Sequence, residues 1–329
     1  MQNQQTEAQA LPLVTLVIAY YQLPVAMLCE CIDSILALSL NGSEREIIVV
    51  DDGSANSPLA ALDKYLGEIV YIRQNHQGLS QARNRGIQAA TGRYLQFVDG
   101  DDYLLRLPYE HCLELVRNGK PDVVMFDFTS STDGDAAATY NTDDLHSGTE
   151  YLSHHNLQAT ACCYLFRRAI LGELRFTPGI YHEDEEFTPQ LLLRADSVRS
   201  TDAQAYYYRQ RPQSITTDTD IRKTLQRLAD MQGVIGKLDR MADTLPTADR
   251  AALQRRVAQL TMDYVYNIIV QTRSRRYLNR KLEELRRQGL FPLPDRDYTQ
   301  KYKWFRRLTN SSAGLSLLMN VLPLMKRER

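Results

Sequence analysis

The sequence predicts an α/β fold with a mostly parallel central sheet flanked by helices, followed by an all-α C-terminal region. Apolar, β-branched runs alternate with helical patterns over the first third of the chain, as in successive βαβ units. From Ile221 onward the apolar residues keep helical spacing instead. A chain of 329 residues with 43% hydrophobic residues can form one large domain or two of ordinary size.

Four buried strands are expected in the first third of the chain. Each is a short apolar run bounded by turn residues, which is typical of strands covered on both faces of a parallel sheet. The runs cover residues 13–20, 46–50, 69–72 and 94–98. Helices are expected between them, beginning at Pro24, running from Ser57 towards Leu66, and covering residues 80–90.

The later elements are less regular. The pattern predicts a helix over residues 108–118, a strand over 122–128, a polar mobile loop over 130–147 and a strand at 206–208 that leads into a basic loop. Residues 248–272 form the clearest helical pattern of the chain, because apolar residues recur there at intervals of three and four.

Acidic turns follow the second and fourth expected strands. Asp51 and Asp52 close the second, and Asp99, Asp101 and Asp102 close the fourth. The carboxyl ends of parallel strands share one edge of a sheet, where ligands bind in open α/β folds. Carboxylates suit Mg²⁺ or Mn²⁺, which in turn bind phosphate oxygens. Either turn alone could be a solvated Asp-Gly turn, but two at one edge favour a nucleotide site.

A dinucleotide fold is the competing interpretation of such an amino-terminal half. The turn after the first expected strand, Tyr20 to Pro24, lacks the Gly-x-Gly-x-x-Gly pattern of such folds. The sequence therefore argues against NAD binding.

Cysteine usage and the first residues predict a cytoplasmic protein. The five cysteines show no paired spacing, and the adjacent Cys162 and Cys163 are poor disulfide partners, so we expect reduced thiols. Residues 1–10 have the composition of a disordered polar tail and lack a signal-peptide core. No apolar run approaches the ~20 residues of a membrane span.

Charge is distributed unevenly along the chain. Residues 221–329 hold 23 Lys and Arg against 10 Asp and Glu, whereas residues 1–220 hold 16 against 30. Basic residues flank the apolar stretch 315–324, which predicts a helix lying on an anionic membrane surface, peripheral to the inner face of the plasma membrane. A helix packed on the domain with a solvated basic face is the alternative. No recognition motif supports nucleic acid as the partner.

Several motifs together resemble the glycosyltransferase family 2 enzymes, which have the Rossmann-like GT-A fold. The resemblance covers about residues 13–216 in five blocks, "LVTLVIAYY", "EIIVVDDGS", "NHQGLSQARNRGIQAATGRYLQFVDGDDYL", "YLFRRAILGELRFTPGIYHEDEEF" and "YYYRQRPQSIT". Two positions depart from the family pattern, since Gly100 replaces a small polar residue and Tyr164 stands where many relatives have lysine.

The resemblance implies transfer of a sugar from a nucleotide diphosphate sugar, with inversion at the anomeric carbon. UDP is the expected nucleotide, and the sugar is of the hexosyl or N-acetylhexosaminyl type. By the family pattern Asp52, beside Asp51, binds the nucleobase or ribose, Asp99 binds the ribose, and Asp101 binds Mn²⁺ or Mg²⁺. The expected acceptor is a glycan or a lipid-linked glycan in polysaccharide assembly.

The acidic run at residues 183–186 is the second candidate site for catalysis. Acids in the first turn of a helix are explained by the helix dipole alone. Inverting transfer, however, needs a carboxylate that removes a proton from the acceptor hydroxyl. The resemblance places this base in the Glu183-Asp184 pair, and Asp184 is the preferred residue.

Three arginines complete the expected site. Arg83 either contacts the donor phosphate or, as we favour, ties its helix to the acidic turns. Arg209 or Arg211 could close over the diphosphate, with solvated side chains on an edge strand as the equal alternative.

The expected organisation is a catalytic domain over residues 11–216, with a nucleotide-binding half (11–105) and an acceptor half (106–216), followed by a basic helical region over 217–329. The alternative function is a catalytically silent nucleotide-sugar-binding protein, which would keep the nucleotide turns but lack a working base.

Overall fold

A computed structural model describes residues 11–131, 139–211 and 220–325. The chain divides into two compact units, which we describe separately. The sheet unit consists of residues 1–145, 160–179 and 194–210, and the helical unit of residues 146–159, 180–193 and 211–329. The tail predicted for residues 1–10 lies outside the described residues.

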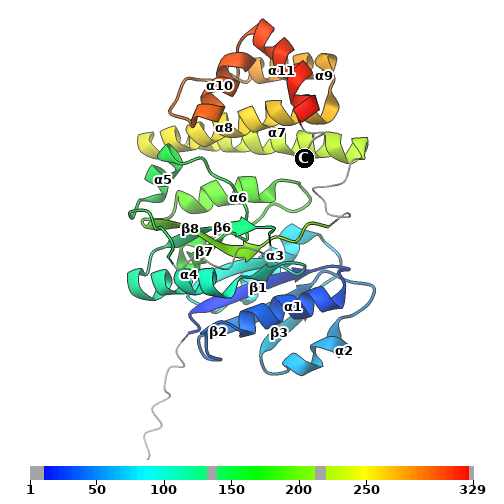
Figure 1. The fold of residues 1–329 in the computed structure, drawn as a ribbon, viewed down its shortest axis with the longest axis vertical. Coiled ribbons are helices and arrows are strands. Elements are labelled where there is room, and N and C mark those ends of the chain that lie inside the picture. The colour runs from blue at the N-terminus through cyan, green and yellow to red at the C-terminus, as the bar shows by residue number, and fades with distance from the viewer. Residues whose placement is uncertain (1–10, 132–138, 212–219, 326–329) are drawn as a thin grey trace, which may run out of the picture. The chain divides into compact units, whose positions relative to one another are not determined.

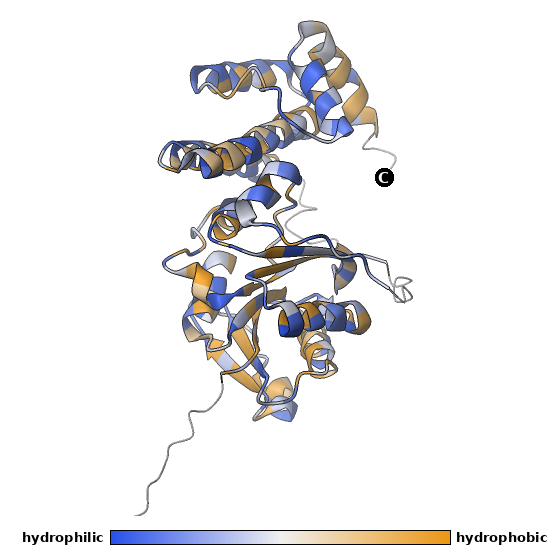
Figure 2. Ribbon diagram, turned by 90° about the vertical axis from the view of Figure 1, so that its left-hand side faces the viewer, coloured by the Kyte–Doolittle hydropathy of each residue, from blue (hydrophilic) through white to orange (hydrophobic). Residues whose placement is uncertain are grey.

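The sheet unit is built on an eight-stranded sheet with the order β3-β2-β1-β4-β7-β6-β8-β5 (Figure 1). The strands are largely apolar (Figure 2), as the sequence predicted. Their bounds are β1 Val14–Tyr20, β2 Arg45–Asp51, β3 Ile69–Arg73, β4 Tyr94–Asp99, β5 Tyr103–Leu104, β6 Val123–Thr129, β7 Tyr164–Arg167 and β8 Val198–Tyr207.

The first four strands are parallel and β1 lies between β2 and β4. All seven residues of β1 are buried, which explains why this strand is apolar throughout. In the register, Tyr20 pairs with Asp51 on one side and Ala19 with Asp99 on the other. The expectation that both acidic turns share one sheet edge is therefore confirmed.

The remaining strands make the sheet mixed. β7 runs antiparallel to β4 and β6, β5 runs antiparallel to β8, and β6 and β8 are parallel. This architecture confirms the predicted fold class. The mostly parallel α/β sheet is flanked by helices, and an all-α region follows at the C-terminal end.

Within the described residues, six helical segments belong to the sheet unit. They are α1 Val25–Leu36, α2 Leu59–Leu62, η1 Asp63–Tyr65, α3 Leu79–Ala89, α4 Arg106–Gly119 and η2 Arg168–Leu171. The helix predicted from Ser57 towards Leu66 is present over residues 59–65, but after one α-helical turn the chain tightens into a 3₁₀ turn. That turn buries Tyr65, whose hydroxyl donates to Asp33 Oδ1 at 2.7 Å.

The polar stretch predicted as a loop over residues 130–147 is partly ordered beside β8. Thr142 forms a β-bridge with Thr201, and the Asn141 amide donates to Asp202 Oδ2 at 2.7 Å. Residues 132–138 lie outside the described residues, so their predicted mobility stays a prediction.

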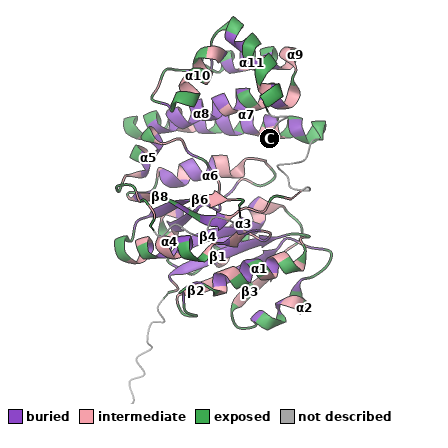
Figure 3. Ribbon diagram, viewed as in Figure 1, coloured by how far each residue is buried: buried purple, intermediate pink, exposed green. Residues whose placement is uncertain are grey.

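The described residues of the helical unit form seven helices. They are α5 Gly148–His154, α6 Glu183–Leu192, α7 Ile221–Ala242, α8 Thr247–Thr272, α9 Arg275–Arg287, α10 Gln300–Thr309 and α11 Ser312–Met325. Buried residues occur along the length of α8 (Figure 3), and α8 lies within one residue of the predicted 248–272 helix. The apolar side chains of α8 pack against those of α7, α9 and α11 in one apolar cluster.

The structure groups the chain differently from a single cut at residue 216. Segments 146–159 and 180–193 belong with the C-terminal helices rather than with the strands that flank them in sequence. The domain boundaries named above stay predictions. All five cysteines are free, as expected. Among the described residues, none of the helices combines the length and apolarity needed to cross a bilayer.

Candidate functional site

The turn after β2 is built around two buried aspartates with separate partners. Asp51 accepts hydrogen bonds from the Ser54 backbone N–H (2.8 Å) and the Tyr71 hydroxyl (2.7 Å). Its side chain is fully buried, and Arg73 lies 3.9 Å away. These are the contacts of a residue that holds the turn, so the donor-binding role predicted for Asp51 stays a prediction.

Asp52 anchors the loop that leads into α3. Its carboxylate accepts from the backbone N–H groups of Gln77 and Gly78, each at 2.8 Å, and from the Gln74 amide at 2.7 Å. His76 Nδ1 lies 2.8 Å from Asp52 Oδ2, and the His76 ring stacks on Tyr21 at 4.1 Å between centroids. His76 thus lies directly beside Asp52.

Backbone packing requires glycine at two positions of these turns. Gly53 has a φ of +79°, and a Cβ there would lie 2.8 Å from the His76 backbone nitrogen. At Gly100 a Cβ would lie 2.9 Å from the Ala19 carbonyl oxygen. The departure from the family pattern at Gly100 therefore permits the turn after β4 to lie close against the end of β1.

The three aspartates after β4 differ in their surroundings. Asp99 is partly exposed and pairs with Arg83, with Nη2 to Oδ1 at 3.0 Å. Asp101 is half-buried, and its backbone carbonyl accepts from Arg209 Nε at 2.8 Å. Asp102 is buried and accepts from the Tyr206 hydroxyl and the Arg209 backbone N–H, both at 2.8 Å.

Charge crowding is strongest at Asp102. Burial, followed by the negative charges of Asp99 and Asp101, raises the pKa of Asp102 to about 8. Because Asp99 and Asp101 disfavour the ionised form of Asp102, a cation at the end of β4 would be electrostatically favoured.

Arg83 belongs to the acidic site, as we favoured, through a structural tie. Its guanidinium is buried and lies over the rings of Phe97 (5.9 Å) and Phe176 (5.4 Å) while it pairs with Asp99. The tie is to the turn after β4 rather than to the Asp51-Asp52 turn. Its neighbour Asn84 joins α3 to Phe176, since the side chain both accepts from and donates to that residue's backbone at 2.9 Å.

Arg209 is fixed beside the same cluster. Its guanidinium donates to Glu30 Oε2 at 2.6 Å and lies over the stacked rings of Tyr103 and Tyr207. The sequence placed Arg209 near the donor but missed Glu30 and the aromatic stack. Arg211 belongs to the helical unit.

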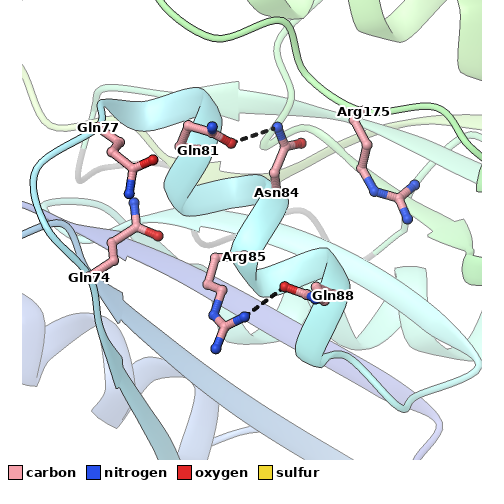
Figure 4. Close-up of a pocket in the computed structure, with 7 residues that line it drawn as sticks. All are labelled: Gln74, Gln77, Gln81, Asn84, Arg85, Gln88 and Arg175. Atoms are coloured by element: carbon pink, nitrogen blue, oxygen red, sulfur yellow. Dashed lines mark hydrogen bonds between the residues drawn. The ribbon is translucent and has the colours of Figure 1, made fainter.

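A separate hollow of about 440 Å³ lies along α3 (Figure 4). Four glutamines, one asparagine and two arginines line it, and the predicted site residues are not among them. These residues are Gln74, Gln77, Gln81, Asn84, Arg85, Gln88 and Arg175. The hollow adjoins the Asp52 loop, because Gln74 and Gln77 also bond to Asp52.

In the helical unit, the acidic run forms the first turn of α6. Asp184 Oδ1 accepts from the Glu185 backbone N–H at 2.8 Å, and both Asp184 and Glu183 are half-buried. The preceding residue, His182, has a left-handed backbone with a φ of +64°. Asp184 and Glu183 are thus at the helix start, as predicted, and their catalytic role stays a prediction.

The next two acids of the run are paired with cations from distant helices. Glu185 forms an ion pair with Arg256 of α8, whose side chain is only 2% exposed. Glu186 pairs with Lys237 of α7 at 2.5 Å. Burial raises the pKa of Glu185, and the nearby Arg256 opposes this rise.

Arg256 also connects α8 to the segment after α5. Its guanidinium donates to the Leu157 carbonyl at 2.6 Å, while Arg255 donates to the His155 carbonyl at 2.7 Å. The sequence did not indicate either arginine, because both belong to a helical pattern that says nothing of contact with a segment 99 to 100 residues earlier.

The comparisons with known proteins agree with this geometry. Residues 15–175 match the family model described as Glycosyl transferase family 2. The chain is 33% identical over 223 residues to the uncharacterized glycosyltransferase EpsJ of Bacillus subtilis, a match that covers 63% of each chain. The chain spans between 56% and 63% of the length of EpsJ and two further curated bacterial relatives that it matches.

Two solved structures share the fold at low sequence identity. The crystal structure of S. aureus TarS 1–349 in complex with UDP-GlcNAc matches with a TM-score of 0.62 at 16% identity, covering 96% of this chain and 91% of that chain. The mannosyltransferase PcManGT of Pyrobaculum calidifontis, in complex with GDP-Man and Mn²⁺, matches with a TM-score of 0.53 at 12% identity, covering 96% and 88%. The family assignment therefore applies to residues 15–175, which carry the acidic turns of β2 and β4 and match glycosyltransferase family 2.

Proposed function

We propose that the protein is an inverting, metal-dependent glycosyltransferase that transfers a sugar from a nucleotide diphosphate sugar. The observation that carries the proposal is the pairing of Asp51 and Asp99 with the end of β1, in a chain that matches family 2 over residues 15–175. This pairing brings the acidic turns to the point where the strand order 3-2-1-4 reverses, and ligands bind at such points in open α/β sheets.

The donor side is proposed to involve Asp52, Asp99, Arg83 and Arg209. Asp52 is tied to the Tyr21–His76 stack, which offers an aromatic surface beside a carboxylate that can accept from a base or ribose. Asp99 is oriented by Arg83 and is 32% exposed, so it retains a surface for a ribose hydroxyl. Asp51 supports this arrangement by holding the turn, and Arg211 remains a proposed diphosphate contact.

The carboxylates at the end of β4 fit a divalent cation that is shared with the donor diphosphate. Among the described residues, no three His, Cys, Asp or Glu side chains form a complete metal site. Mg²⁺ and Mn²⁺ sites of this kind use one or two carboxylates and take further ligands from the substrate phosphates and water. Asp101 is the proposed ligand, and a bound cation would supply Lewis-acid stabilisation of the departing diphosphate.

Asp184 is the proposed general base, with Glu183 as the second candidate. It would take the proton from the acceptor hydroxyl as that oxygen attacks the anomeric carbon opposite the diphosphate. A single displacement of this kind inverts the configuration and needs no covalent intermediate. The Arg256–Glu185 pair supports the proposal, because it fixes the turn of α6 that carries Asp184.

The proposed biological setting is bacterial polysaccharide or teichoic acid synthesis. Relatives of this chain include the Bacillus subtilis minor teichoic acid biosynthesis protein GgaB and a poly(ribitol-phosphate) beta-glucosyltransferase. UDP is the proposed nucleotide, supported by the UDP-GlcNAc complex of TarS. A hexose or N-acetylhexosamine would be transferred, at the cytoplasmic face of the membrane, to a glycan or lipid-linked acceptor.

A panel of nucleotide sugars tests the proposal, with donor hydrolysis and transfer followed separately in the presence of Mn²⁺. We expect turnover of at least one UDP-sugar and loss of turnover with a chelator. Binding of a nucleotide sugar without hydrolysis or transfer to any acceptor would favour the alternative, a catalytically silent binding protein.

A further inference from the structure

The last two helices of the helical unit, α10 and α11, pack on each other. Helix α11 has one packed apolar face and one exposed apolar face. Leu315 and Leu318 of α11 are both 6% exposed and belong to the apolar cluster of the unit. On this side, α11 is a packed structural helix. The alternative to membrane binding, a helix packed on the domain, is therefore correct for one face of α11.

A second face of α11 is apolar and exposed. Leu317, Val321 and Leu324 are 53%, 39% and 63% exposed, and their spacing of four and three residues places them on one side of the helix. We call these three residues the outer face of α11. When a helix is apolar on its exposed side as well as on its packed side, we expect the exposed side to contact another apolar surface.

The exposed side of α10 combines an aromatic ring with positive charge. Trp304 is 60% exposed and is the only tryptophan of the chain. The Arg307 guanidinium lies 5.5 Å from its ring centroid, and Lys301 is exposed one turn earlier. Tryptophan beside lysine and arginine is the combination that favours the boundary between lipid and water.

Net positive charge surrounds these helices. Residues 273–325 contain twelve Lys and Arg against four Asp and Glu, and α11 itself contains no charged residue. Three of the bases are paired with acids, Lys281 with Glu284, Lys303 with Asp297 and Arg306 with Asp295. Exposed arginines on α9 add to the remaining charge, namely Arg276, Arg280, Arg286 and Arg287.

We propose that α10 and α11 bind the surface of an anionic lipid bilayer. The outer face of α11 and the Trp304 ring would enter the boundary between headgroups and acyl chains, and the exposed bases would contact anionic headgroups. Positive charge around an uncharged apolar helix complements this surface better than it complements a second copy of the same basic unit. The inference is independent of the proposed function, because it uses no residue of the acidic site.

Vesicle binding tests the proposal with the full-length protein. We expect co-sedimentation with phosphatidylglycerol-containing vesicles, little binding to phosphatidylcholine alone, and weaker binding as salt rises, because exposed charges are screened over ~8–10 Å at physiological ionic strength. Because Trp304 is the single tryptophan, its emission should shift to shorter wavelength on binding and be quenched by brominated lipid.

The decisive variant is Leu317→Gln with Val321→Gln, which changes the outer face and leaves the packed face intact. We expect vesicle affinity to fall by roughly tenfold or more, because two apolar contacts with lipid are lost. The matched control is Leu59→Gln with Leu66→Gln, which replaces two exposed leucines of the sheet unit and should bind as the wild type does. Deleting residues 312–329 is a poor test, because it removes Leu315 and Leu318 from the apolar cluster.

A second pair of variants tests the charge. Lys301→Gln with Arg307→Gln should weaken binding on the order of tenfold, whereas Arg222→Gln with Lys223→Gln at the start of α7 should not. The proposal is overturned if the wild type ignores anionic vesicles at low salt, or if Trp304 stays accessible to water when the protein binds. It is also overturned if the outer-face variant binds as wild type, or if that variant instead abolishes self-association of a protein that does not bind lipid.

Discussion

The acidic turn after β2 and the acidic start of α6 are stabilised in different ways. In the sheet unit, Asp51 and Asp52 accept hydrogen bonds mainly from backbone N–H groups and neutral side chains within 26 residues of them. In the helical unit, Glu185 and Glu186 are paired with Arg256 and Lys237, which lie 71 and 51 residues later in the sequence. One cluster is held by local turn chemistry and the other by charge from distant helices.

The difference has an energetic consequence. A carboxylate held by several backbone donors loses little when one neighbouring side chain changes, since each neutral hydrogen bond contributes about 0.5–1.5 kcal/mol. A buried carboxylate opposite one buried cation depends on that cation, because removal of the partner leaves an uncompensated charge. We therefore expect the helical unit to be the more sensitive of the two to single substitutions.

The largest effect is expected at Asp184, where only the chemistry should change. Asp184→Asn keeps the shape of the side chain but cannot accept the acceptor proton. Transfer should fall by a factor on the order of 10²–10⁴ while UDP affinity stays nearly constant. Initial-rate kinetics and calorimetry measure the two quantities. Glu183→Gln is the matched control, and a larger loss in that variant would make Glu183 the base.

Arg256→Met tests the dependence of Glu185 on a distant cation. We expect the free energy of unfolding to fall by about 3–5 kcal/mol, because a buried carboxylate loses its partner. Denaturant unfolding followed by circular dichroism measures this change. The double variant with Glu185→Met should recover much of the loss. If the double variant is as unstable as Arg256→Met, the packing of the arginine stem matters more than the ion pair.

Asp101→Ala tests the acidic turn after β4. Calorimetry should show that Mn²⁺ no longer strengthens UDP binding, because the remaining acids cannot hold the cation while Asp99 stays available to the ribose. The stability of the fold should change little, since Asp101 lies in a turn. Unchanged Mn²⁺-dependent affinity would remove Asp101 from the metal site.

The smallest effect is expected at Lys237, whose side chain is half exposed. Lys237→Met should lower the free energy of unfolding by about 1 kcal/mol or less, because solvent screens the half-exposed ammonium of this pair. The same denaturant series as for Arg256→Met gives the comparison. A loss as large as that of Arg256→Met would show that exposure does not separate the two pairs.

Elements that arise from local sequence patterns were predicted more accurately than elements that depend on distant partners. β1 and α8 were predicted to within one residue because a continuous apolar run and a regular helical repeat are local patterns. The short β7 and the antiparallel pairing of β5 with β8 were not predicted, because they depend on partners far away in the sequence. The change from α-helix to 3₁₀ turn after Leu62 was also not predicted.

The same distinction applies to the candidate site. Asp52 and Asp99 could be placed at one sheet edge because strand alternation alone fixes that geometry. The ties from Tyr206 to Asp102 and from Arg256 to Glu185 join residues 104 and 71 positions apart. Neither tie produces a local pattern, so a single sequence did not indicate them.

The helical unit is assembled from separate segments of the chain, so its parts become available for folding at different times during synthesis. All eight strands of the sheet unit are present once the ribosome has made residue 207. Segments 146–159 and 180–193, however, are made before α8, whose arginines bind them. Because chains are made from the N-terminus at ~5–20 residues per second, α5 and α6 wait several seconds for these partners. During that interval α5 and the acidic start of α6 are accessible to chaperones, whereas in the finished protein they are in contact with α8.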